Sequence, residues 1–67
     1  MILYQLQQGW AEFMQKHNVV PDYLLITATL HDQLQSELAE VRSMPECVRD
    51  VTIIEADNVP GWFYAKK

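Results

Sequence analysis

The shortness of the chain is the strongest constraint on its fold, because 67 residues can form only one hydrophobic core. At this length folding buries only about 60% of the surface that the unfolded chain exposes, so the margin of stability is small. Nearly every apolar residue is then needed for the core, which leaves little room for a substrate cavity. We therefore expect one domain over residues 1–67 that binds through its surface and gains stability by self-association.

Composition and charge exclude several classes of protein. Apolar residues make up 49% of the chain and charged residues 21%, as in a folded globular domain. The net charge of −4 repels phosphate backbones, so direct contact with nucleic acid is not expected. No window approaches the roughly 18 apolar residues of a membrane span, and the first residues do not resemble a signal peptide. A single cysteine, Cys47, fits a reducing compartment, and we expect a cytoplasmic protein.

Apolar residues that recur every three or four positions predict two helices. The first covers residues 2–17 and stops near His17, where Asn18 can adopt the left-handed conformation. Its apolar stripe is made of Leu3, Leu6, Trp10, Phe13, Met14 and His17. Gly9 within this helix is interpreted as a close approach by another part of the backbone. The second helix starts after Thr29 as its N-cap and ends before Pro45, with a stripe made of Leu30, Leu34, Leu38 and Val41.

Three β-prone segments predict three strands. Residues 23–27 are apolar on both faces, which places this strand inside the sheet. Residues 44–50 are predicted to be a loop, and residues 51–56 alternate with a period of two. Pro60 and Gly61 have the order that a type II turn requires, and residues 62–65 follow them. We expect the last two strands to form a hairpin.

The order helix, strand, helix, strand, strand predicts an α+β fold of two layers, in which two helices cover one face of a three-stranded mixed sheet. The connection between the first two strands is long enough for a right-handed crossover, so these strands are expected to be parallel. Two sheet orders stay open: the third strand lies between the other two, as in a split β-α-β unit, or pairs outside the second.

The uncovered sheet face is the predicted interaction surface, with candidate residues Tyr23, Leu25, Trp62 and Tyr64. An alternative surface is acidic, with candidate residues Glu37, Glu40 and Glu46. The first surface predicts a homo-oligomer that forms through the sheet face or an edge strand. The second predicts a small acidic inhibitor or regulator that docks on a basic partner protein.

The residues that could carry chemistry are few. His17 is interpreted as a helix-capping residue, His31 as an exposed histidine and Cys47 as a partly buried small residue. No pair of them has the spacing of a metal site, and no nucleophile has a base close by in the sequence. We therefore expect no catalytic, cofactor or metal site, no small-molecule substrate and no enzymatic activity.

Part of the chain resembles a known viral unit. The run from Pro21 to Leu34, followed by Val51-Thr52-Ile53-Ile54 and by Asn58-Val59-Pro60-Gly61, looks like the strand–helix–hairpin unit in the axial domain of tailed-phage major capsid proteins. The resemblance spans residues 21–61. It implies a matching local topology and a phage or prophage origin, whereas the extended arms and the long spine helix that build capsid shells have no counterpart here.

Overall fold

Strand β1 (Tyr23–Ile26) is the centre of the sheet in the computed structural model, which describes residues 1–67. Strand β2 (Thr52–Glu55) pairs with β1 in parallel, and β3 (Trp62–Ala65) pairs with it in antiparallel orientation, so the sheet order is β2-β1-β3. The inner position of the first strand and its parallel pairing with the second are confirmed. A strand that is apolar on both faces gains most from this position, because neighbours then pair with both of its edges.

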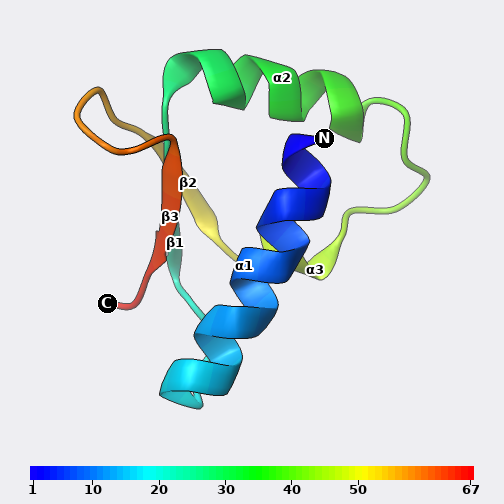
Figure 1. Cartoon of the computed structure of the whole chain (residues 1–67). Coiled ribbons are helices and arrows are strands. Elements are labelled where there is room, and N and C mark those ends of the chain that lie inside the picture. Colours follow the sequence, from blue (N-terminus) through cyan, green and yellow to red (C-terminus); the bar gives the residue numbers. More distant parts are fainter.

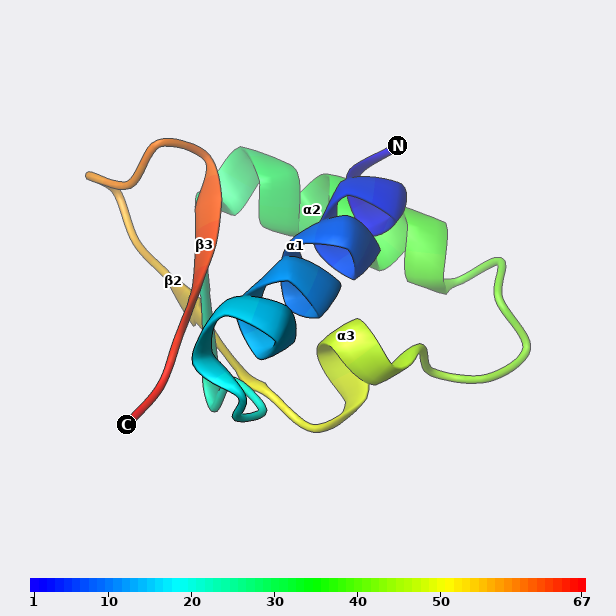
Figure 2. The ribbon, with the colours of Figure 1, turned by 60° about the horizontal axis from the view of Figure 1, so that its bottom comes forward.

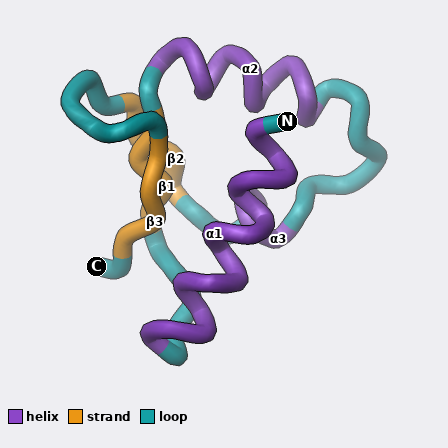
Figure 3. The backbone as a smooth tube through the Cα atoms, viewed as in Figure 1, coloured by secondary structure: helices purple, strands orange, loops and turns teal.

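The predicted hairpin and both predicted strand orders are wrong, because β2 and β3 are not neighbours. The segment between them crosses the end of β1. On one side the Ala56 N–H donates to the Ile26 carbonyl at 3.0 Å, and on the other the Thr27 N–H donates to the Gly61 carbonyl at 2.9 Å. Gly61 adopts a φ of 97°, which a glycine reaches without strain. The turn residues therefore make a wide loop, seen in Figure 3, instead of a tight two-strand turn.

All helices lie on one side of the sheet, as Figures 1 and 2 show. Helix α1 (Ile2–His17) runs along the sheet, and α2 (Ala28–Leu38) crosses α1 near the N-terminal end of α1. Helix α3 (Glu46–Arg49) is a single short turn. The two-layer α+β fold with helices on one face is thus confirmed. The end of α1 is also confirmed, because Asn18 has a left-handed φ of 57° and its N–H donates to the Met14 carbonyl.

Three local predictions need correction. The N-cap of α2 is Thr27 and not Thr29, because the carbonyl of Thr27, the residue that follows β1, already accepts the His31 N–H at 2.8 Å. The same helix ends at Leu38, which leaves Val41 exposed beyond it. Within the predicted loop 44–50, α3 forms after Pro45 because its two middle residues, Cys47 and Val48, are buried in the core.

The core lies between the helices and the inner face of the sheet. Its buried members come from every element except β2 and are Ile2, Leu3, Leu6, Leu24, Ile26, Leu34, Cys47, Val48 and Tyr64. Partly buried Trp10, Phe13, Leu30, Leu38, Val51, Ile53 and Trp62 pack around them. The chain therefore uses most of its large apolar residues for one core, as its length requires.

Helix α1 approaches β3 closely at Gly9. A Cβ atom at this position would clash with the far edge of the Trp62 indole of β3. The approach predicted at Gly9 is therefore real, but the neighbour is an aromatic side chain and not a backbone. The absence of a side chain at Gly9 leaves room for the edge of the indole against the helix.

Replacing Gly9 by Ala tests this contact. Alanine gains about 1 kcal/mol of helix propensity, but its methyl group displaces the Trp62 indole, and overpacking of this kind costs about 1–3 kcal/mol. We expect a lower free energy of unfolding in urea and a red shift of tryptophan fluorescence. Gln15→Ala, at an exposed position of the same helix, is the control and should not destabilise. A Gly9→Ala variant that is more stable than the wild type would show that Trp62 moves away freely.

Candidate functional site

The two faces of β1 have different neighbours. Leu24 and Ile26 are 0% exposed beneath the helices, whereas Tyr23 and Leu25 point to the opposite face. No helix covers that opposite face in either view of the ribbon (Figures 1 and 2). We call it the open face. Its strand residues are Tyr23, Leu25, Thr52, Ile54, Phe63 and Ala65.

Strand register builds an apolar row across the middle of the open face. Leu25 lies opposite Ile54 of β2 on one side and opposite Phe63 of β3 on the other. Ile54 is 39% exposed and Phe63 is 40% exposed, which is high for side chains of this size. None of the six strand residues of the open face is charged, in a protein with nine acidic and five basic residues. The face is therefore an apolar and uncharged surface that faces solvent.

Two of the four predicted interface residues lie elsewhere. Tyr23 and Leu25 are on the open face, but Trp62 and Tyr64 lie opposite Ile26 and Leu24 and face the helices. The reason is that β3 pairs with β1 and not with β2, which sets the side on which each of its residues lies. The sequence shows the alternation of β3 but not its register with β1. It therefore does not identify Phe63 and Ile54 as residues of the open face.

Tyr64 is a structural residue of the core. It is 8% exposed, and its hydroxyl donates a 2.7 Å hydrogen bond to the Cys47 carbonyl of α3. Burial raises the pKa of this phenol far above its ordinary value, so the hydroxyl stays a donor. Trp62 lies next to it in an edge-to-face contact, with ring centroids 5.9 Å apart. Tyr64 thus contacts α3 and Trp62 contacts α1, so both residues link β3 to the helices.

The predicted acidic surface does not form one patch of free carboxylates. Glu37 of α2 accepts the Leu3 N–H at 2.9 Å and the Ile2 N–H at 3.1 Å, so it caps the first turn of α1. These hydrogen bonds hold the pKa of Glu37 below its usual value. Glu46 lies 3.7 Å from Arg49, while Glu40 is exposed beyond the end of α2. Glu37 therefore acts within the fold, as a cap supplied by another helix.

The histidines and the cysteine lie in separate places. His31 Nδ1 is 2.8 Å from Glu55 Oε1, which joins α2 to β2, and His31 Nε2 is 3.3 Å from the Gln35 side chain. His17 is exposed and lies against the Phe13 ring, with centroids 4.4 Å apart. Cys47 is buried, and burial raises the pKa of its thiol, which disfavours the thiolate nucleophile. No three His, Cys, Asp or Glu side chains are grouped closely enough to hold a metal ion.

Comparison with known proteins adds no relative. No protein-family model, no curated protein and no solved structure matches the chain. None of its helices has the length and apolar character needed to cross a membrane.

Glu37→Gln tests the cap on α1. Because the folded state lowers the pKa of Glu37, its stabilising effect is fully present above the ordinary value of 4.5 and is lost as the pH falls through the folded value. We expect a lower Tm than the wild type at pH 7 and a difference that shrinks below pH 4.5. Thermal unfolding followed by circular dichroism measures it. Glu40→Gln is the matched control, and an equal effect of both variants at all pH values would contradict the cap.

Proposed function

We propose that this chain is a non-enzymatic protein–protein interaction module of the cytoplasm that forms a homodimer through the open face of its sheet. The observation that carries the proposal is the row of Ile54, Leu25 and Phe63, which is apolar and covered by no element of the chain. Burial of such a row against a partner removes apolar surface from water, which drives association.

A second copy of the chain is the partner that suits this surface. Two copies with a net charge of −4 repel each other over most of their surfaces. The open face avoids this repulsion, because its strand residues are uncharged. In a two-fold dimer, the row of one copy would pack against the same row of the other copy. Two apolar rows can pack in this way without any matching of charges.

The size of the face sets the strength of the dimer. Three strands of four residues, at the usual strand spacing and rise per residue, present a flat area of roughly 200 Å². Stable complexes bury about 800 Å² on each partner. We therefore propose a weak, concentration-dependent dimer rather than an obligate one. A phage or prophage origin, implied by the resemblance of residues 21–61, is compatible with this proposal but does not support it.

Phe63→Asp tests the dimer. The carboxylate would be buried against its own copy, so we expect the dimer dissociation constant to rise more than tenfold in sedimentation equilibrium, with little change in Tm. Tyr4→Asp adds the same charge at an exposed aromatic residue of α1 and should leave association unchanged. Ile54→Asp, on the opposite side of the row, should act like Phe63→Asp. A wild type that stays monomeric up to millimolar concentration would overturn the proposal.

Tyr64→Phe separates the core from the surface. Loss of the hydrogen bond to the Cys47 carbonyl should lower the free energy of unfolding by about 1–2 kcal/mol. Association should not change below the unfolding transition, because Tyr64 lies on the helix-covered face. Denaturation in urea measures the free energy of unfolding, and sedimentation at two salt concentrations measures association. An acidic contact surface would instead show association that falls steeply as salt is added, which would contradict an apolar interface.

A further inference from the structure

A groove runs between the second half of α1 and the outer edge of β3. It has a volume of about 270 Å³ and is open to solvent. Phe13, Lys16 and His17 line it from the helix, and Trp62, Phe63 and Tyr64 line it from the strand. Phe63 points its side chain to the other face of the sheet, so its presence here means that the edge of β3 itself forms one wall.

The backbone of this edge has hydrogen-bonding groups without a neighbouring strand. The Gly61 and Ala65 carbonyls accept N–H groups from Thr27 and Asp22, which flank β1. Alternation along an antiparallel strand then directs the N–H and C=O groups of Trp62 and Tyr64 outward, toward the groove. An extended segment placed there would find two residues with which to pair.

Nothing in β3 protects this edge from pairing. Exposed edges are usually blocked by a charged residue, a proline or a bulge. The strand Trp62–Ala65 has none of these, whereas the other edge strand, β2, carries Glu55. The edge of β3 is therefore the better of the two for strand addition.

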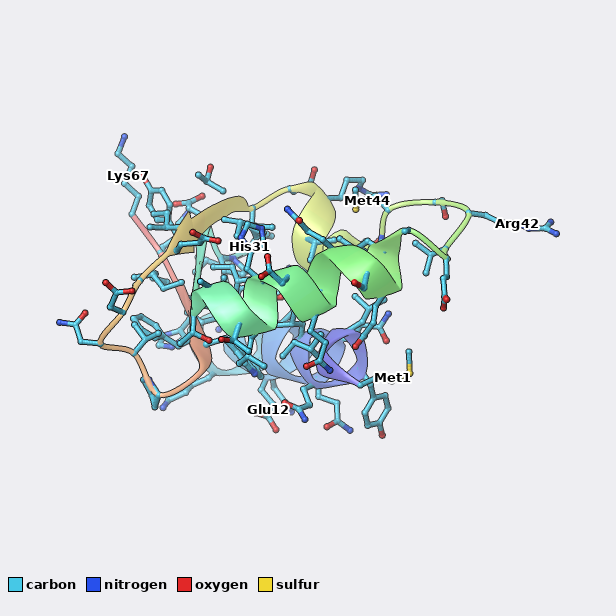
Figure 4. All side chains as sticks on the ribbon, turned by 90° about the horizontal axis from the view of Figure 1, so that it is seen from above. Met1, Glu12, His31, Arg42, Met44 and Lys67 are labelled. Carbon is cyan, nitrogen blue, oxygen red and sulfur yellow. The ribbon has the colours of Figure 1, made fainter.

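The charges around the groove indicate the composition of the segment. Lys16 and His17 line the groove at the end of α1, whereas Lys66 does not line it and is paired with Asp22 at 3.1 Å. In Figure 4, Arg42 lies far from Glu12, which is one of the residues that line the groove. The groove also contains one carboxylate, Glu12. Lys16 is the one lysine or arginine of the lining, and it can pair with a carboxylate of a ligand.

We propose that this groove binds an extended acidic peptide segment of a partner protein, which adds to β3 as a fourth strand and places a carboxylate against Lys16 and His17. Main-chain pairing with Trp62 and Tyr64 provides the affinity, and the groove between Phe13 and Tyr64 accepts an apolar side chain. The site shares only Phe63, at the edge of β3, with the open face and does not require the homodimer.

Selection from a random decapeptide display library on the purified chain tests the proposal. We expect the enriched peptides to alternate apolar and polar residues, to lack proline in the pairing segment and to carry acidic residues at one end. A synthetic copy of the most enriched peptide, titrated into ¹⁵N-labelled protein, should shift the amide resonances of Lys16, His17, Trp62 and Tyr64. No enrichment, enrichment of basic peptides, or shifts confined to the open face would overturn the proposal.

Charge reversal gives the decisive comparison. Lys16→Glu should weaken binding of the selected peptide about tenfold. Arg42→Glu makes the same change in net charge at an exposed residue far from the groove and should have no effect beyond twofold. Replacement of the central residue of the peptide by proline should abolish binding, because it removes a pairing N–H. Equal effects of the two protein variants, or tolerance of proline, would contradict strand addition.

The monomeric variant Ile54→Asp distinguishes this site from the homodimer. Ile54 belongs to the open face and does not line the groove. We expect this variant to lose self-association and to bind the peptide with unchanged affinity. A simultaneous loss of both properties in a folded variant would overturn a separate groove site, while loss of peptide binding by Lys16→Glu alone would leave the homodimer proposal standing.

Discussion

Pairing on both edges of β1 is the interaction on which the rest of the structure depends. The strand has β2 on one edge and β3 on the other, and β2 and β3 do not pair with each other. Its alternation divides the sheet into a core face with Leu24 and Ile26 and an open face with Tyr23 and Leu25. Without β1 the two remaining strands would have no partner, because each of them pairs only with β1. Each is only four residues long and would not be stable alone.

The asymmetry of the two layers follows from the small size of the chain. All of the helices pack on the same side of the sheet, where they form the single core (Figure 1). The second face and the outer edges then stay without cover, which leaves an apolar row in the middle and an unprotected strand at β3. In a larger α/β protein a second layer of helices would cover that face. Here the same surfaces are open to partners.

The position and the end of α1 could be predicted, because they depend on residues close together in the sequence. The stripe of α1, its end at Asn18 and the apolar character of β1 are all local properties. The contacts that hold these elements together were not predictable. Glu37 looked like one of several acidic surface residues, yet it caps a helix whose first turn lies 34 residues earlier in the chain. Only the packing of α2 against α1 gives this carboxylate its role.

The sequence by itself determined the fold class, the inner position of the first strand, the close approach at Gly9 and the scarcity of chemical groups. These properties follow from composition and from periods of two or 3.6 residues. The tertiary structure alone decided the strand order and, with it, the face on which each residue of β3 lies. The physical reason is that a strand shows which of its residues share a side, but only its pairing partner determines which side is buried. Tyr64 therefore belongs to the core, Trp62 packs against the core from the same face, and Phe63 belongs to the surface.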